Sequence, residues 1–212
     1  MPTCHLHYLE FLFFDDVKAL NAGVHIGDSQ VSILLYADDI VLVSETADGL
    51  QSVLDKVDEW SVKWRVKFNN KKSNVVHFRK PYIPHTNHTF ILGDAHLDIV
   101  HQYKYLGIIC NEYLDFNVTA KALADAGSRA LGAVINKYVS INGLGYYTFS
   151  KIYQSGVCPI LDYCGEIWGF QDYAVINSVQ NKAMRIYLGV HRFASNAAVS
   201  GDMGWTFPFN QA

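Results

Sequence analysis

The 212-residue sequence predicts an α+β fold, with strands and one helix in its first half and mainly helices in its second half. Up to about residue 110, short apolar runs alternate with turn-forming residues, as in strands and hairpins. From Asn117 onward, apolar residues recur every three or four positions, which is typical of amphipathic helices. We therefore expect two regions, residues 1–110 and residues 111–212.

The first region contains the stretch ILLYADDIVL. The apolar residues Ile33–Leu35 and Ile40–Val43 predict two buried strands, and Tyr36–Asp39 is the expected tight turn between them. A helix is expected from Thr46 to about Trp64, because the apolar residues there keep helical spacing. The sequence thus predicts a hairpin followed directly by a helix.

Further strands, one more hairpin and three more helices are expected along the rest of the chain. The strands are Val66–Phe68, Asn74–Phe78 and the segment YKYLGIIC, the hairpin turns at Gly93–Asp94, and the helices cover Asn117 to about Tyr138, Tyr146–Ser155 and Asp172–Leu188. Gly189 is the expected C-cap of the last helix. The final twelve residues, GDMGWTFPFNQA, show no helical periodicity.

Asp38 and Asp39 are two adjacent carboxylates between two apolar runs. Aspartate is a common turn residue, because its side chain bonds to nearby backbone groups, and this accounts for one aspartate better than for two. Neighbouring negative charges repel each other unless a cation compensates them, and Mg²⁺ binds carboxylate oxygens together with phosphates. Turn formation and metal binding are both open at this point.

Charge is unevenly distributed along the chain. Residues 1–59 contain eleven acidic side chains and two lysines, whereas residues 60–93 contain seven basic side chains and no acidic one. These basic residues are Lys63, Arg65, Lys67, Lys71, Lys72, Arg79 and Lys80, and they alternate with Trp60, Trp64, Phe68 and Phe78. Such a segment suits phosphate contacts combined with base stacking, and a merely solvated face is the alternative.

Several classes of protein are disfavoured by composition. The sequence has no apolar run of about eighteen residues, so we expect no membrane span, and its start lacks a basic leader, so we expect an intracellular protein. The four cysteines show no disulfide or zinc pattern, and Cys4 with His5 and His7 is an incomplete zinc ligand set.

Several motifs occur in an order that resembles a known family. YADD lies between two predicted strands, NNKKS follows the next helix and precedes a strand, YLG comes after these, and QNKAMRIYLG lies farther on. This order is similar to the second half of the reverse transcriptase palm of non-LTR retrotransposons, together with the helical segment downstream of the palm. The resemblance covers about residues 11–205 and implies a partial polymerase palm in residues 1–110, with a small mixed or antiparallel sheet and a packed helix, followed by a helical thumb-like region.

The resemblance implies a role for each motif residue. Asp38 would bind a metal ion directly and Asp39 would support it, in a site for two Mg²⁺ or Mn²⁺ ions. Tyr36 would lie beside the primer terminus or the incoming nucleotide. Lys72 would neutralise the departing pyrophosphate, with Lys71 as the alternative in a shifted register.

The remaining roles concern nucleic acid. Tyr105, Leu106 and Gly107 would position the primer backbone, with ordinary sheet packing as the alternative for the first two. The basic segment from Lys63 to Lys80, which includes Arg65, Lys67 and Lys71, would bind nucleic acid through its phosphates rather than its base edges. By family, the partners are an RNA template, a DNA primer and deoxynucleoside triphosphates.

The sequence also departs from the family pattern. The family's further catalytic aspartate and its fingers precede the hairpin, and we find neither in these residues. Asp15 and Asp16 belong to the helix expected before the hairpin and are poor substitutes. We therefore expect a truncated polymerase domain that is inactive alone; a non-catalytic nucleic-acid-binding fragment, or the product of a decayed element, is the alternative.

Overall fold

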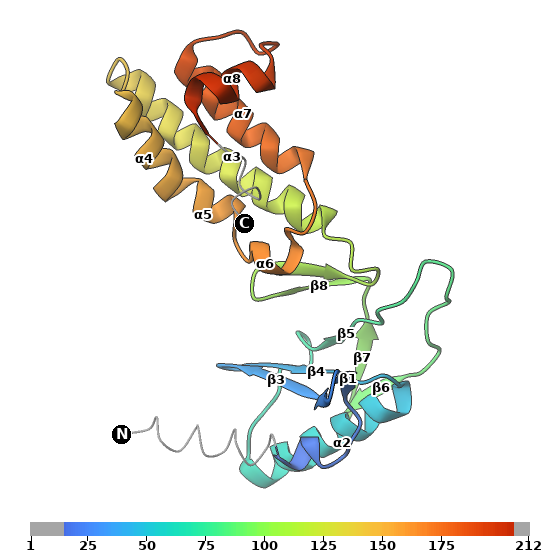
Figure 1. Cartoon of the computed structure of the whole chain (residues 1–212). Helices are drawn as coiled ribbons and strands as arrows, with labels where there is room; N and C mark the ends of the chain where they lie inside the picture. The colour runs from blue at the N-terminus through green and yellow to red at the C-terminus, as the bar shows by residue number, and fades with distance from the viewer. Residues whose placement is uncertain (1–14, 206–212) are drawn as a thin grey trace. The chain divides into compact units, whose positions relative to one another are not determined.

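The structure is a computed structural model and describes residues 15–205 (Figure 1). The chain divides into two compact units, Met1–Tyr103 and Lys104–Ala212, and each is described by itself. Strands predominate in the first unit and helices in the second, so the predicted α+β class is confirmed. The cluster of Cys4, His5 and His7 lies outside the described residues.

Two antiparallel hairpins open the first unit. Strands β1 (Val24–Ile26) and β2 (Ser29–Val31) form one, and strands β3 (Ile33–Tyr36) and β4 (Asp39–Leu42) form the other, which was predicted. The expectation that both of the latter strands are buried was wrong for one face. Ile33 is buried whereas its neighbour Leu34 is 48% exposed, because successive strand residues point to opposite faces and only one face meets the core.

Helix α2 (Ala47–Trp64) begins where the sequence predicted. The hydroxyl of Thr46 accepts a hydrogen bond from the backbone N–H of Gly49 at 3.1 Å, which satisfies one of the free N–H groups of the first turn. Val53, Leu54 and Val57 are spaced for one helical face and are buried in the core of this unit.

A small mixed sheet lies beside this helix. Its strands are β5 (Asn74–Val75), β6 (Phe90–Leu92) and β7 (Ala95–Ile99), in the order β5-β7-β6, with β5 parallel and β6 antiparallel to β7. The side-chain amide of Gln51 in α2 pairs with both backbone groups of Ile91, donating to its carbonyl at 2.9 Å and accepting from its N–H at 3.0 Å. Gln51 thus covers the edge that β6 presents.

Of two further predicted strands, one does not form and the other is shorter than expected. Val66–Phe68 is not a strand, because the N–H of Val66 is used in closing helix α2, where it donates to the carbonyl of Ser61 at 3.0 Å. The strand predicted for Asn74–Phe78 ends at Val75, which pairs with Ile99, the last residue of β7. Residues beyond Val75 therefore have no partner strand in this sheet.

The segment predicted as one strand forms a hairpin. Strand β8 (Gln102–Tyr105) pairs with β9 (Ile108–Asn111), and Leu106 and Gly107 make the turn with φ of 45° and 90°. Both values lie in the left-handed region, which two-residue hairpin turns of one common type require and which glycine adopts most easily. The boundary between the two units falls within β8.

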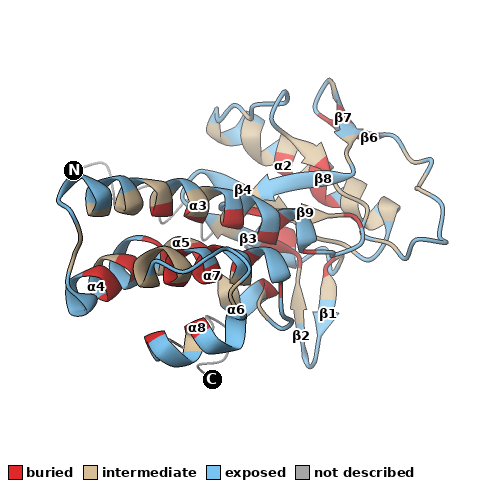
Figure 2. Cartoon of the chain, turned by 90° about the horizontal axis from the view of Figure 1, so that it is seen from above, coloured by how far each residue is buried: buried red, intermediate tan, exposed pale blue. Residues whose placement is uncertain are grey.

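The second unit is a bundle of helices. The predicted helices are confirmed as α3 (Asn117–Ser140), α4 (Tyr146–Gly156) and α7 (Ala174–Leu188), with Gly189 as C-cap at φ 64°. Helices α5 (Cys158–Leu161), α6 (Gly165–Trp168) and α8 (Asn196–Met203) were not predicted, and α8 includes residues of the tail that was expected to be irregular. The buried residues line the facing sides of α3, α5 and α7 (Figure 2).

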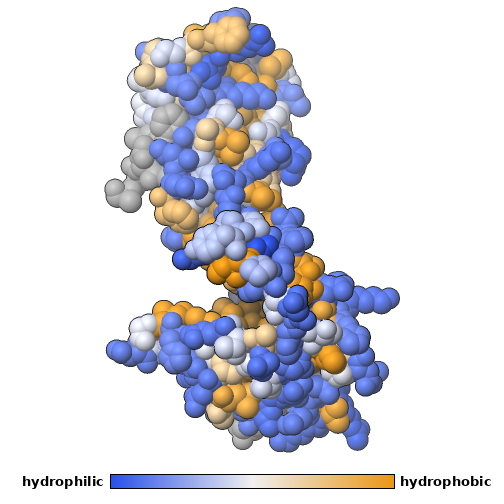
Figure 3. Space-filling view, turned by 90° about the vertical axis from the view of Figure 1, so that its right-hand side faces the viewer, coloured by the Kyte–Doolittle hydropathy of each residue, from blue (hydrophilic) through white to orange (hydrophobic). Residues whose placement is uncertain are grey.

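Surface character is mixed. On the face drawn in Figure 3, hydrophilic side chains predominate and apolar ones are scattered among them, as on most proteins. None of the described helices combines the length and the apolarity that crossing a lipid bilayer requires.

Candidate metal and nucleic-acid site

The tip of the β3–β4 hairpin carries the two adjacent carboxylates. Tyr36 pairs with Asp39 across the strands, so Ala37 and Asp38 form a two-residue turn. Ala37 has φ of 52°, a conformation that costs most residues about 1 to 2 kcal/mol. Ile40 packs on the core, and therefore Asp39 points to the opposite, outward face, on the same side as its cross-strand partner Tyr36.

Neither carboxylate is compensated by a neighbouring cation. Asp38 and Asp39 are both exposed, and neither side-chain carboxylate forms a hydrogen bond or an ion pair with another described residue. The β6–β7 hairpin provides a contrast, because its turn is Gly93–Asp94 and contains a single aspartate, with the glycine at φ 60°. Turn formation explains Asp94, whereas at the β3–β4 tip it leaves the second aspartate unexplained. Two adjacent carboxylate groups are a donor set suited to Mg²⁺ or Mn²⁺.

Lys72 lies in the turn between α2 and β5. The turn is closed by N–H groups of Lys72 and Ser73, which donate to the carbonyl of Asn69 at 2.9 and 3.1 Å. The hydroxyl of Tyr103, in β8, donates to the carbonyl of Lys72 at 3.1 Å and so fixes the turn from a distant part of the sequence. The ammonium group of Lys72 is exposed and is not paired with Asp38.

Most cationic side chains of the basic segment Lys63 to Lys80 are exposed to solvent and unpaired, so they can contact phosphates. The exposed cations of this segment that form no ion pair with a described residue are Lys63, Arg65, Lys67, Lys71, Lys72 and Lys80. Arg79 is engaged within its own loop, where it donates to the carbonyl of Ile83 and contacts the ring of His85. The predicted stacking surface was wrong for two of the four aromatic residues, because Trp60 and Phe68 pack against the core.

The YLG motif has a structural partner that the sequence did not reveal. The hydroxyl of Tyr163 donates to the carbonyl of Leu106 at 2.9 Å. A Cβ atom on Gly107 would lie 2.8 Å from the Cε1 atom of Tyr163, so only glycine fits beneath this ring. Tyr105 is half-buried in β8, while Leu106 and Gly107 are exposed. Tyr163 lies 57 residues from Leu106, and no local pattern connects the two.

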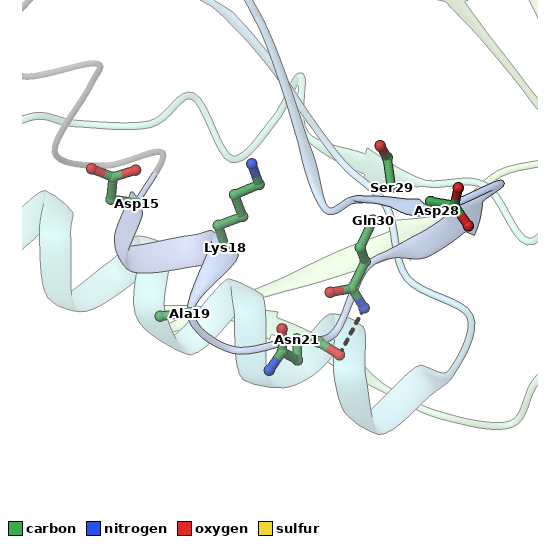
Figure 4. A pocket seen from close by; sticks show the side chains of 7 residues that line it. All are labelled: Asp15, Lys18, Ala19, Asn21, Asp28, Ser29 and Gln30. Atoms are coloured by element: carbon green, nitrogen blue, oxygen red, sulfur yellow. Dashed lines mark hydrogen bonds between the residues drawn. The ribbon is translucent and has the colours of Figure 1, made fainter.

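A hollow of about 570 Å³ lies elsewhere in the first unit (Figure 4). It is polar, and its lining residues are Asp15, Lys18, Ala19, Asn21, Asp28, Ser29 and Gln30. The amide of Gln30 donates to the carbonyl of Asn21 at 3.0 Å across it. Asp15 therefore borders this hollow, whose lining does not include the hairpin carboxylates.

Comparison with known proteins identifies the class. Residues 11–110 match the family model described as reverse transcriptase (RNA-dependent DNA polymerase), so this segment is similar to that family. The matched segment contains the hairpin carboxylates, Lys72 and the YLG motif.

The relatives specify the type as that of non-LTR retrotransposons. The chain is 29% identical over 201 residues to the RNA-directed DNA polymerase from mobile element jockey of Drosophila funebris, which covers 91% of the chain and 22% of that protein. It is 24% identical over 188 residues to a probable RNA-directed DNA polymerase from transposon X-element of Drosophila melanogaster, covering 83% of the chain and 20% of that protein.

A third relative is a retrovirus-related Pol polyprotein from type-1 retrotransposable element R2 of Nasonia vitripennis. It is 26% identical over 113 residues, which cover 50% of the chain and 11% of that protein. The chain thus spans about a fifth or less of the length of these relatives. No solved structure gives a significant match to the chain.

Proposed function

We propose that the β3–β4 hairpin supplies metal-binding carboxylates to the active site of an RNA-directed DNA polymerase. The observation that carries this proposal is the pair of adjacent, exposed and unpaired aspartates at the tip of a hairpin within the matched segment. The relatives are several times longer than this chain, and we propose that the other ligands and the nucleotide-binding fingers belong to the additional length. The first unit would then be part of the palm, and the second a thumb-like region.

The hairpin geometry suggests a role for each residue of the candidate active site. Asp38 lies in the turn and is the proposed direct metal ligand, and Asp39 is the supporting carboxylate. A bound Mg²⁺ or Mn²⁺ pair would polarise the primer hydroxyl and stabilise charge on the triphosphate. Tyr36 shares the outward face with Asp39, where it would contact the primer terminus or the deoxynucleoside triphosphate. Lys72 is the proposed counter-charge for pyrophosphate.

Metal binding tests the carboxylate roles. We expect Mn²⁺ to bind the 212-residue chain weakly in calorimetry, because two carboxylates without phosphate make an incomplete site. Asp38→Asn and Asp39→Asn should each abolish this binding. Asp94→Asn is the matched control, since Asp94 also lies exposed in a hairpin turn of the same unit. Binding that survives in both hairpin variants would refute the assignment.

Primer extension tests the proposal that the 212-residue chain carries only part of the active site. We expect no DNA synthesis by the 212-residue chain on a primed RNA template with Mg²⁺ or Mn²⁺, because a two-ion site needs ligands on both sides of the ions. In a longer protein that includes this segment, Asp38→Ala should abolish synthesis. Extension by the 212-residue chain that Asp38→Ala removes would show that its own residues complete the site.

The basic segment is the proposed contact for the RNA template and DNA primer. Six exposed cations that contact phosphates would give a slope of about −4.2 for the logarithm of the association constant against that of salt, at about −0.7 per contact for a single strand. Replacing Lys71 and Lys72 by glutamine should make the slope less steep by about 1.4. Lys121 and Lys137 on helix α3 are exposed control positions. An unchanged slope in the Lys71/Lys72 variant would refute this contact.

The cellular setting is part of the same proposal. Copying RNA into DNA requires access to cellular nucleotides and nucleic acid, so we propose that the protein acts inside the cell.

A further inference from the structure

The loop between helices α7 and α8 lies at one end of the helical bundle (Figure 1), and it exposes an aromatic ring beside the guanidinium group of Arg192. Phe193 is 75% exposed. The guanidinium carbon of Arg192 lies 4.6 Å from the centre of this ring, and the centre of the His191 ring lies 5.1 Å from it. An arginine stacked on an aromatic ring combines a flat apolar surface with a fixed positive charge.

Hydrogen bonds hold this loop in place. Helix α7 ends at Gly189, and the side chain of Arg185 reaches across the loop to the carbonyl of Ala194, with distances of 3.3 Å from Nε and 2.9 Å from Nη2. Arg185 also donates to the side chain of Asn196, at the start of α8. The N–H of Ala194 donates to the carbonyl of His191 at 2.9 Å. The loop is therefore preorganised, so a ligand that stacks on it has less conformational entropy to remove.

The sequence around the loop is cationic. Residues 173–201 contain Lys182, Arg185 and Arg192 and no aspartate or glutamate. Lys182 and Arg192 are exposed, and neither forms an ion pair with a described residue. This part of the surface therefore attracts anions, and the exposed ring gives an anion with a flat aromatic group a second point of contact.

We propose that Phe193 is a stacking platform for an unpaired base of a nucleic-acid strand, with Arg192 beside it contacting the adjacent phosphate. Every nucleobase has an aromatic face, so stacking binds single strands with little regard to sequence, and a duplex does not offer its bases in this way. The inference rests on the proposed function for the nature of the ligand. It adds a contact in the second unit, separate from the hairpin carboxylates and from the basic segment of the first unit.

The same unit offers a matched control. Phe170 is 72% exposed, nearly as much as Phe193, and its ring contacts Phe116 edge-on at 6.1 Å. It lies outside the cationic stretch 173–201. Phe170→Leu and Phe193→Leu remove the same aromatic surface from equally accessible positions, so a difference between them reports on the surroundings of Phe193.

Binding of a short single-stranded RNA to the full 212-residue chain, followed by fluorescence anisotropy, tests the proposal. We expect Phe193→Leu to weaken binding about 10-fold, within the range for loss of one stacked base, and Phe193→Trp to preserve it. Phe170→Leu should leave it unchanged, and binding of a blunt duplex should not respond to Phe193→Leu. A 2-aminopurine base in the RNA should be quenched by the unsubstituted chain and less so by Phe193→Leu. Arg192→Gln should make the salt dependence less steep by about one contact.

Three results would overturn the inference. One is equal RNA binding by the unsubstituted chain and Phe193→Leu, and another is an equal loss in Phe193→Leu and Phe170→Leu. In either case, weakening by the Lys71/Lys72 glutamine variant would show that the proposed function stands while the Phe193 platform does not. The third is no nucleic-acid binding by the chain, which would remove the proposed contacts of both units. Circular dichroism of each variant establishes that it is folded.

Discussion

Replacing Gly107 by alanine probes the YLG motif most directly. At φ 90° this residue adopts a backbone conformation that suits glycine, and a Cβ atom would lie 2.8 Å from the Cε1 atom of Tyr163. The ring of Tyr163 must then move, and its hydroxyl loses the 2.9 Å hydrogen bond to the carbonyl of Leu106. The substitution therefore combines backbone strain, steric displacement and the loss of a hydrogen bond.

The expected change in the free energy of unfolding is the sum of these contributions. Strain at a positive φ costs about 1 to 3 kcal/mol, and a lost hydrogen bond about 1 kcal/mol. Alanine restricts the unfolded chain and returns about 0.4 to 1 kcal/mol. We expect Gly107→Ala to lower the free energy of unfolding of the second unit by about 1 to 3 kcal/mol.

Hydrogen exchange of amides in helix α3 measures this change in the second unit alone. A double-mutant cycle with Tyr163→Ala separates the causes, because that background has neither the ring nor the hydroxyl. There Gly107→Ala should cost about 1 kcal/mol less, with only the strain remaining. A cost below about 0.5 kcal/mol in the unsubstituted background, or equal costs in both, would refute the structural explanation. Gly107 would then be explained better by approach of the primer.

Three further predictions concern the helix start, the sheet edge and the half-buried thiol of Cys158. Thr46→Ala should lower the free energy of unfolding of the first unit by about 1 kcal/mol, measured with urea, because α2 loses its N-cap. Gln51→Ala should speed hydrogen exchange of the Ile91 amide, since it removes a hydrogen bond worth about 1 kcal/mol. Burial raises the pKa of Cys158 from 9.0 to about 11, so at pH 8 thiol reagents should react about 100-fold more slowly than with an exposed cysteine. Because the folded state resists ionisation of this thiol, stability should fall as pH rises from 9.0 to about 11.

Each of these predictions has its own control. Thr46→Ser keeps the capping oxygen and should retain stability, so equal losses in both variants would argue against capping. For Gln51→Ala, unchanged exchange at Ile91 would show that the amide pairing contributes nothing to the edge. Burial also raises the pKa values of Cys110 and Tyr153, so Cys158→Ser should reduce the loss of stability between pH 9.0 and about 11 without abolishing it. An unchanged loss in Cys158→Ser would show that Cys158 does not contribute to it.

Local patterns predicted the elements that depend on local sequence. The β3–β4 hairpin, helix α2 and the C-cap at Gly189 were all predicted correctly. The patterns that predict them are apolar runs around a turn, apolar residues at helical spacing and a glycine after the last helical residue, and each involves only neighbouring residues. Helices α5 and α6 have four residues each, too few for a period to show. The missing strand at Val66–Phe68 depended on hydrogen bonds made by the end of α2, which propensity does not specify.

Contacts between distant residues were the part that the sequence could not predict. Tyr163 meets Leu106 and Gly107, and Tyr103 holds the Lys72 turn, and in neither case does spacing or composition connect the partners. Trp60 is partly buried against the packed core, a contact that local sequence does not predict either, and so it is not part of the proposed stacking surface. Motifs in the sequence therefore identified the candidate functional residues. The contacts that hold these residues in place were visible only in the structure.

The hairpin shows how that support serves the candidate metal site. A two-stranded hairpin by itself is at best marginally stable in water. Here one face packs on the core through Ile33 and Ile40, while the opposite face keeps Tyr36 and the carboxylate of Asp39 toward solvent. Apolar burial thus fixes the backbone on one side, and the alternation of side chains leaves the other side open to ions and nucleotide. A polar substitution such as Ile40→Asn should therefore weaken Mn²⁺ binding through loss of rigidity, although Ile40 itself offers no ligand.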